Sequence, residues 1–363
     1  MGSFSQMAFA LEFPELKGLE CHVARFRARS AMNSLYRADV SILMPVSDLE
    51  RLGPRGLLGH EAALLLAVPG KAAGRGRAPG ASGPAAERGR WPGTVAEFSA
   101  GALAGGWAVC DLAVAPAMAL LAGRESSRVH VNQSGPDAVR ETLEACGLDP
   151  SLFRFDIDRG AYPKREFVFR RGEDPLNFVM RTLERDGIAL RFDLCGKREQ
   201  PVFSDSNSSF PPLGGADGEF ELEVSRVSGL AGNLGISGLF GAARESVRPA
   251  AKVRLRDFDW ERPGTPLEAV EEVAGWGSGE IYLYGENFDT AAEGKRLCGA
   301  VRDAEIWRSE LVTGSCRAPG LAAGVTVSVK GLGGSEKGAR YLVAGQDCSG
   351  SQARAVAAAV GLS

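Results

Sequence analysis

The clearest pattern of apolar and polar positions lies in residues 165–193. Phe167 and Phe169 alternate with polar neighbours, which is the period of a half-buried strand. Asp174 fits the N-cap of a helix that starts with a proline, and Gly187 fits its C-cap. Apolar residues follow helical spacing between the caps and alternate again after them: Leu176, Val179, Met180, Leu183, then Ile188, Leu190, Phe192. The segment therefore predicts a strand, a helix and a strand whose apolar stripe builds a core.

A second helix is predicted shortly before this segment. Ser134 and Asp137 fit a capping box, and Pro136 precedes the apolar run. Val139, Leu143 and Cys146 share one face before Gly147. Two short helices between short strands predict a compact α/β module over residues 128–202.

Alternating segments mark a β-rich region on each side of this module. In the first, residues 22–27 and 35–42 predict a hairpin with a turn near Asn33, and the apolar run 62–68 predicts a further strand. In the second, strands are predicted at 253–256, 281–284 and 325–329. A helix capped by Thr290 fits between the last two, since Leu297, Ala300, Val301 and Ala304 lie on one helical face.

Two segments have the composition of loops. Residues 69–93 combine glycine, proline, alanine and arginine with almost nothing to bury, which predicts a long flexible loop between two strands. Its arginines could suggest an RNA-binding tail, but no aromatic residues interleave for base stacking, so a solvated loop is favoured. Residues 204–218 predict a linker.

Composition and charge narrow the class of protein. With 363 residues the chain should contain about two or three domains. A hydrophobic content of 44% and a charged content of 24% are ordinary for a globular protein, and the formal charge of −3 does not favour a nucleic-acid partner. The 47 glycines favour turn-rich β structure over helical bundles.

No metal or cofactor site is predicted. The seven cysteines are scattered, none within a CxxC spacing, and the three histidines lie away from them: Cys21, Cys110, Cys146, Cys195, Cys298, Cys316, Cys348 and His22, His60, His130. The cysteines are predicted to be reduced small apolar residues, and Cys195 and Met180 to fill the core.

The chain shows no secretory leader, and its longest helix-compatible apolar stretch, 112–122, contains Pro116 and is too short for a bilayer. We therefore expect synthesis and folding in the cytoplasm, with any export by a route that reads no N-terminal signal.

Several groups of residues could carry catalysis, and each also has a structural interpretation. Asp257 and Asp259 would lie on one side of a strand, as a metal or acid/base pair needs, yet they sit at a strand end beside arginines and a turn. The run Glu268, Glu271, Glu272 is predicted to be a solvated helix face. Residues 101–106 are glycine-rich but lack the lysine of a phosphate loop.

Two further groups are weak candidates. Ser315 and Cys316 have no histidine nearby in the sequence, although a distant His60 or His130 could approach them in space. Arg165, Arg170 and Arg171 form a basic strand, for which surface charge is favoured over a ligand site. No catalytic residue is assigned, and we predict that the protein is not an enzyme.

The order of these elements resembles that of VgrG spike proteins of type VI secretion systems and of late-control D-like hub proteins of contractile phage tails. The resemblance rests on the 165–193 segment, the opening strands, the run VRLRDFDWERP at 253–263, IYLYGENFDTAAEG at 281–294 and TGSCRAPGLAAGVTVSV at 313–329. It covers roughly residues 20–345 in the correct order. The insertion at 69–93 and the lack of a following barrel and needle depart from the spike proteins.

The resemblance implies an α+β fold with two β-barrel-like tube domains and an intervening small α/β module. The first tube domain would span 7–125 with a flexible insertion at 69–93, the module 126–203 and the second tube domain 219–348. It further implies a homotrimeric structural hub that joins a hexameric tube protein to a spike or needle protein within a baseplate. Two alternatives stay open: a tail-associated cell-wall-degrading enzyme, which would need paired carboxylates or a metal set, and an effector-binding adaptor.

Overall fold

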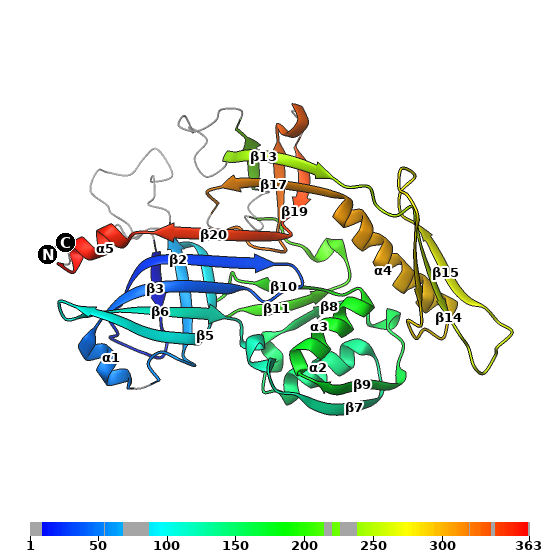
Figure 1. Cartoon of the computed structure of the whole chain (residues 1–363), viewed down its shortest axis with the longest axis horizontal. Helices are drawn as coiled ribbons and strands as arrows, with labels where there is room; N and C mark the ends of the chain where they lie inside the picture. Colours follow the sequence, from blue (N-terminus) through cyan, green and yellow to red (C-terminus); the bar gives the residue numbers. More distant parts are fainter. Residues whose placement is uncertain are drawn as a thin grey trace.

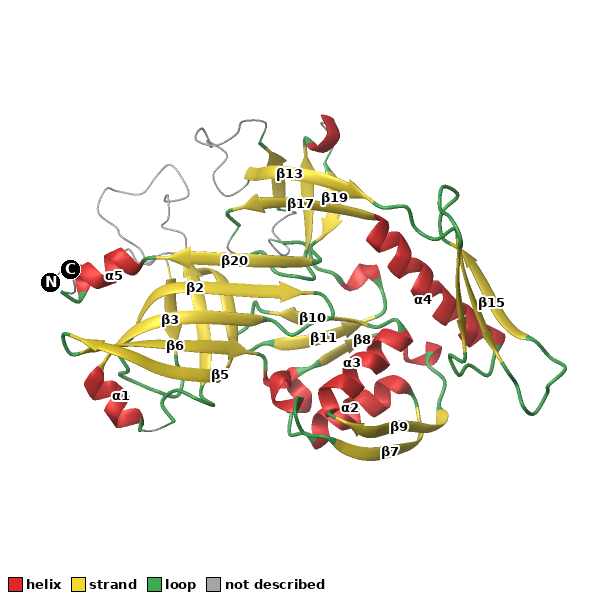
Figure 2. Cartoon of the chain, viewed as in Figure 1, coloured by secondary structure: helices red, strands yellow, loops and turns green. Residues whose placement is uncertain are grey.

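The computed structural model describes residues 9–53, 55–67, 87–213, 220–225, 238–318, 320–334 and 338–361. These residues form five β-sheets (Figures 1 and 2). Two of the longer helices lie in one α/β part of the chain, and the longest described helix lies along a separate small sheet. None of the helices in these ranges has both the length and the apolar character that a membrane crossing requires.

The largest sheet, sheet A, has seven antiparallel strands in the order β1, β4, β5, β6, β3, β2, β20. Its strands are β1 (Phe9–Glu12), β2 (His22–Ala31), β3 (Arg37–Pro45), β4 (Glu61–Ala67), β5 (Glu87–Ala104), β6 (Trp107–Ala115) and β20 (Gly345–Ser351). The last strand of the chain therefore pairs with one of the first, and Figure 1 shows β20 lying along β2.

Sheet A curls so that its first strand approaches its other end. The Phe9 ring of β1 lies 4.8 Å from the Phe26 ring of β2 in an edge-on arrangement. The side-chain amide of Gln352, just after β20, donates hydrogen bonds to the carbonyls of Phe9 and Val23 at 3.0 and 2.8 Å. Because the two ends of the sheet meet in these contacts, sheet A is strongly curled, in the manner of a barrel.

One sequence prediction about sheet A was wrong, namely that residues 69–93 form a loop throughout. Residues 87–93, assigned to the flexible loop, belong to strand β5, and Trp91 pairs with Leu64 of β4. Trp91 is only 1% exposed and contacts the Tyr36 ring edge-on at 5.8 Å. The rest of the predicted loop, 69–86, lies outside the described residues. Composition misled here because one large aromatic residue among glycines and prolines is enough to fix a strand to the core.

The α/β module contains two small sheets and two helices. Sheet B pairs β7 (Ser126–Gln133) with β9 (Arg165–Glu173), and sheet C has the order β10 (Ala189–Asp193), β11 (Gln200–Ser204), β8 (Arg154–Asp156). Helices α2 (Gly135–Ala145) and α3 (Pro175–Asp186) are capped by Ser134 and Asp174, as predicted, and Gly187 takes the left-handed conformation with φ 68°. The predicted strand, helix and strand of 165–193 are thus confirmed.

Two further sheets follow in sequence. Sheet D has the order β17 (Glu310–Cys316), β13 (Gly238–Ser246), β12 (Glu221–Val224), β18 (Thr326–Lys330), β19 (Ala339–Leu342). Sheet E has the order β15 (Leu267–Glu272), β14 (Lys252–Asp257), β16 (Glu280–Tyr284). Because β13 pairs with β17, sheet E and the helix that follows it form a unit inserted between two neighbouring strands of sheet D.

Helix α4 (Ala291–Ser309) covers one face of sheet E. Thr290 caps it by accepting a hydrogen bond from the Glu293 N–H at 3.2 Å, as predicted. Leu297 and Cys298 are buried and pack against Val253 and Leu255 of β14. The remaining short elements are α1 (Val46–Leu52), α5 (Ala353–Ala359) and the 3-10 helices Ala117–Leu121, Pro150–Leu152, Arg159–Ala161, Asn207–Ser209 and Leu332–Gly334.

Candidate functional site

Sheet B carries an exposed apolar face, which we call the sheet B face. Its members, with their exposed fractions, are Val129 (48%), Val131 (60%), Phe167 (59%) and Phe169 (47%). Val129 lies opposite Phe169 and Val131 opposite Phe167 in the register, so the four side chains form two adjacent cross-strand pairs. The alternation predicted a half-buried strand correctly, but the phenylalanines lie on the open face.

Polar residues occupy the buried face of sheet B instead. The His130 side chain is fully buried, stacks on the Phe178 ring at 5.5 Å, and its Nδ1 lies 3.1 Å from a carboxylate oxygen of Glu141. Gln133 donates to the same oxygen at 2.7 Å. These hydrogen bonds, from Gln133 first and His130 second, lower the pKa of Glu141. Sheet B is therefore held to helices α2 and α3 partly by a polar network, while the four apolar side chains of the sheet B face point outward.

Sheet E has a second exposed surface on the side away from α4, which we call the sheet E face. Tyr282 and Tyr284 of β16 and Val270 of β15 are exposed on it. Between them Arg254 of β14 donates to Glu280 at 2.5 Å and forms an ion pair with Glu268. The sheet E face thus combines two exposed tyrosines with an ion-paired arginine, and tyrosine and arginine are both enriched in protein contacts.

The loop after β14 extends this aromatic character. Phe258 is 58% and Trp260 77% exposed. The two carboxylates considered for catalysis hold this loop: Asp257 accepts hydrogen bonds from the N–H groups of Phe258 and Phe288, and Asp259 accepts from the N–H of Arg262 at 3.0 Å and its Nε at 2.8 Å. Desolvation raises the pKa of Asp259, but these bonds from Arg262 outweigh it and leave the pKa lowered. This geometry supports the structural interpretation of both carboxylates.

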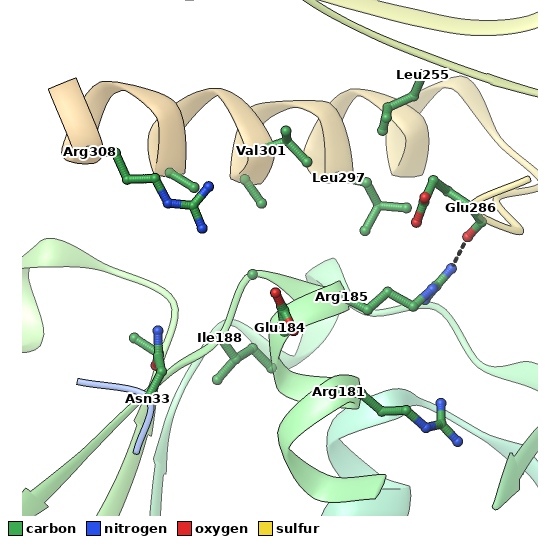
Figure 3. Close-up of a pocket in the computed structure, with 14 residues that line it drawn as sticks. Asn33, Arg181, Glu184, Arg185, Ile188, Leu255, Glu286, Leu297, Val301 and Arg308 are labelled. Atoms are coloured by element: carbon green, nitrogen blue, oxygen red, sulfur yellow. Dashed lines mark hydrogen bonds between the residues drawn. The ribbon is translucent and has the colours of Figure 1, made fainter. Parts of the chain in front are cut away.

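A cleft of about 550 Å³ lies between helices α3 and α4 (Figure 3). Ile188, Leu297 and Val301 give it apolar walls, and Arg181 and Arg308 also line it. It holds no adjacent nucleophile and base among the described residues that line it.

Charged contacts beside this cleft join the α/β module to the α4 unit. Arg165 of β9 forms an ion pair with the buried Glu293 of α4 and donates to the Asn287 carbonyl at 2.7 Å. Arg185 donates to the Glu286 carbonyl at 2.5 Å, the contact dashed in Figure 3, and burial lowers its pKa, with nearby Arg165 adding to that effect. Partners more than 100 residues apart meet here, which sequence reasoning did not predict.

Comparison with known families gives a match over most of the chain. The family model described as phage tail baseplate hub (GPD) matches residues 29–353. The chain belongs to the phage tail baseplate hub family. The match begins near the end of β2 and ends at the start of α5, so it includes strands of all five sheets, with β1 outside it.

Curated relatives of this hub-family chain are spike proteins. It is 24% identical over 296 residues to the type VI secretion system spike protein VgrG5 of Pseudomonas aeruginosa, a match of 81% of this chain and 34% of the relative. It is 30% identical over 163 residues to VgrG4b of the same organism, which covers 45% of this chain and 19% of that one. The chain thus spans about a third of the length of the first of these relatives.

Solved structures show the same hub fold. A component of the type VI secretion system of E. coli superposes with a TM-score of 0.62 at 18% identity, covering 94% of this chain and 73% of that one. A tail protein of Neisseria meningitidis gives a TM-score of 0.61 at 13% identity, covering 95% and 92%. These similarities confirm the predicted α+β class with two curled β-sheets and a few helices.

Within this hub fold, two predictions about charged residues were wrong. Glu268, Glu271 and Glu272 lie in strand β15 and not on a helix. Glu268 and Glu272 alternate with Leu267 and Ala269, which pack under α4, whereas Glu271 lies on the α4 side and accepts a hydrogen bond from Arg302 at 2.8 Å. Of the basic strand 165–171, only Arg171 is the exposed surface charge predicted, since Arg165 is ion-paired and Arg170 is buried.

The remaining candidates lie on separate parts of the hub fold. Ser315 and Cys316 are in sheet D, whereas His60 precedes sheet A's strand β4 and His130 is in sheet B. Residues 101–106 form the end of the β5–β6 hairpin. The described residues contain no cluster of three or more potential metal ligands.

The seven cysteines are free, but their placement varies. Burial raises the pKa of Cys21 to about 12, with nearby Asp48 and Glu20 adding to the effect, so this thiol is unreactive at neutral pH. Cys195, predicted to fill the core, is exposed, while Met180 packs partly buried against the core as predicted. Cys195 follows strand β10, in a turn where its N–H donates to Asp193.

Proposed function

We propose that this chain is a structural hub at the tip of a contractile injection apparatus, where it forms a homotrimer that joins a hexameric tube to a spike. The observation that carries the proposal is the family match over residues 29–353, on a chain whose two largest sheets flank an α/β module. The curated relatives are named spike proteins, which supports a role in assembly without catalysis.

Symmetry explains why such a chain would need two similar β-rich parts. A trimer matches a six-fold ring only if each subunit offers two similar surfaces, since three chains with two surfaces each give six. Sheets A and D are the candidates, within tube domains that we place at 7–125 and 219–348, with the α/β module at 126–203. Strand β20 (Gly345–Ser351) begins at the end of the second tube domain and extends sheet A, and this would hold the two tube domains together within one subunit.

The exposed apolar surfaces supply the contacts that assembly needs. Neighbouring apolar side chains left open on a folded chain are typical of protein interfaces. The sheet B face is of this kind, and the sheet E face adds exposed tyrosines around the ion-paired Arg254; both lie on units outside sheets A and D. We propose that they contact neighbouring subunits or other baseplate components, with the tube protein and a separate spike or needle chain bound along the axis. Nucleic acid is not among the proposed partners.

The proposal also gives a location. The chain would be made in the cytoplasm and assembled into a baseplate or a virion-like particle, with export only on contraction. The choice between a secretion system and a phage-like tail would follow from the tube protein that the hub binds.

Light scattering coupled to gel filtration tests the trimer directly. The purified chain should elute with three times the mass of one chain, or reach that mass when the tube protein of a contractile apparatus is added. Electron microscopy of the same sample should show a three-fold ring with a central hole. A mass equal to one chain at high concentration, with no ring in the presence of the tube protein, would overturn the proposal.

A further inference from the structure

A cavity of about 750 Å³ lies where sheets A, C and D meet, apart from the cleft between α3 and α4. Its walls are mostly apolar and come from segments far apart in the chain: Trp91 of β5, Phe192 and Leu194 at the end of β10, Leu213, Leu321 and Val325 before β18. An apolar pocket built by several elements is the usual setting of a ligand site, provided that a few polar groups converge on it.

One buried charge does line this cavity. Arg191 of β10 is 4% exposed. Its Nη2 donates to the Ser209 carbonyl at 3.4 Å, and its Nε has no hydrogen-bond partner among the described residues. Burial lowers the pKa of Arg191, and the charges of Asp193 and Asp156 offset this only in part without forming an ion pair with it. Gly324 admits the arginine stem, because a Cβ atom there would come within 2.6 Å of the Arg191 Cβ.

The two arginines at the neighbouring interface provide a contrast. Arg185 and Arg296 each donate to backbone carbonyls at 2.5–2.7 Å and each lie within 3.4 Å of the Asp186 carboxylate. Arg191, in contrast, has one hydrogen bond of 3.4 Å to a backbone carbonyl and no ion pair among the described residues. A buried cation without a counter-ion is costly, so a group that supplies the missing negative charge would gain most of that free energy on binding.

We propose that this cavity binds a carboxylate carried on an apolar body, with Arg191 as the partner of the anion. A guanidinium presents a planar set of donors that matches a carboxylate, and its weak hydration suits a buried position. Lys197 also lines the cavity and adds positive charge, while Asp193 lies on the same side and is engaged by the N–H of Cys195 at 3.0 Å. The apolar walls would receive the rest of the ligand.

Such a carboxylate could be the C-terminus of another polypeptide or a free small acid, and the two sources need separate probes. N-acetyl-leucine represents the small acid. An acetylated tetrapeptide that ends in leucine with a free carboxyl group represents the chain terminus. The amides of both compounds are neutral controls of the same shape. The fluorescence of Trp91, which lines the cavity, reports binding, and a Trp91→Phe variant identifies its share of the signal.

The carboxylate forms should bind at least about tenfold more tightly than their amides, because charge-assisted hydrogen bonds are lost with the charge. A tighter tetrapeptide assigns the site to a chain terminus, and equal affinities assign it to a small acid. If neither carboxylate binds, or the amides bind as well, the proposal is wrong.

Two variants separate a ligand site from a merely structural arginine. Arg191→Met should abolish the preference for the carboxylate while leaving the melting temperature of the unliganded chain unchanged or higher, since it removes an unpaired buried charge. A lowered melting temperature together with an intact preference would overturn the proposal. Ala322→Phe keeps the arginine and fills the cavity, so it should weaken the binding of both carboxylate probes by a similar factor. Arg171→Met replaces an exposed arginine and should change neither the binding nor the melting temperature. The fluorescence titration measures binding to this cavity in the monomer and in the trimer alike, so a negative result would not affect the hub proposal.

Discussion

Gly187 ends helix α3 directly against Ala300 of helix α4. A Cβ atom added to Gly187 would lie 2.7 Å from the Cβ of Ala300, closer than such atoms come in proteins, and Gly187 also has a φ of +68°. One glycine therefore serves two purposes: it reverses the chain into strand β10 and it lets the α/β module approach the α4 unit.

This contact predicts that Gly187→Ala destabilises the protein more than an ordinary glycine cap would. Gly147, at the end of α2, is the matched control, because it has a φ of +90° and no atom within 4 Å of an added Cβ. We expect Gly147→Ala to cost about 1 kcal/mol and Gly187→Ala about 1 kcal/mol more. Urea unfolding measures both. In a double-variant cycle Ala300→Gly should relieve the extra cost; additive effects would contradict the close contact.

The ion pair between Arg165 and Glu293 predicts a second difference in stability. Glu293→Gln leaves a partly buried guanidinium without its carboxylate and should lower the free energy of unfolding by about 2 kcal/mol, the usual contribution of a hydrogen bond to a charged group. The control is the ion pair between Arg244 and Glu310, whose side chains are both exposed, so that Glu310→Gln should have no measurable effect. Equal effects of the two substitutions in thermal unfolding would contradict a specific role for Glu293.

The sheet B face predicts an effect on assembly without an effect on folding. Phe167→Ser with Phe169→Ser removes two exposed rings whose strands pair independently of them. We expect only a small drop in the melting temperature of the monomer, from the loss of two cross-strand pairs, and a lower fraction of trimer, or of complex with baseplate components, in light scattering. Serine in place of Val168, which lies between them on the inner face, is the control and should lower stability instead. Unaltered assembly with every partner tested would exclude this face as an interface.

Glu141 predicts a dependence of stability on pH. Its pKa is lowered in the folded protein by hydrogen bonds from Gln133 and His130, with Arg128 adding to the effect. The carboxylate therefore stabilises the fold above the ordinary pKa of a glutamate, and this contribution is lost as the pH falls through the lowered folded-state pKa. Glu141→Gln should lower the free energy of unfolding at pH 7 and lose its effect in acid. Glu144→Gln on the same helix is the control; a constant difference between Glu141→Gln and the natural chain across this pH range would contradict the prediction.

The contrast between Trp91 and Phe167 shows where sequence patterns stop being informative. Alternation identified the strand that contains Phe167, but not which of its faces is buried, because the polar network around His130 occupies the inner face. Composition assigned Trp91 to a loop, although the ring is buried against Tyr36. In both cases the deciding partners lie on other elements.

For the candidate sites, too, contacts between sequence neighbours could be predicted and contacts between distant segments could not. The structural interpretation of Asp259 was available from its neighbours in the sequence, since the carboxylate accepts from Arg262 three residues later. The ion pair of Arg165 with Glu293, 128 residues away, and the unpaired charge of Arg191 could not be predicted, because nothing in a local pattern states which distant groups approach.

The sequence by itself determined the local elements: the caps at Ser134, Asp174 and Thr290, the reversal at Gly187 and the order of strands and helices that marks a baseplate hub. Those features depend on backbone conformation and on hydrogen bonds within a few residues, which residue type controls directly. Only the tertiary structure decided that the last strand joins the first sheet, which apolar faces stay open, and which arginine is buried without an ion pair among the described residues. These depend on pairing and burial between distant segments, and many arrangements satisfy the same local pattern.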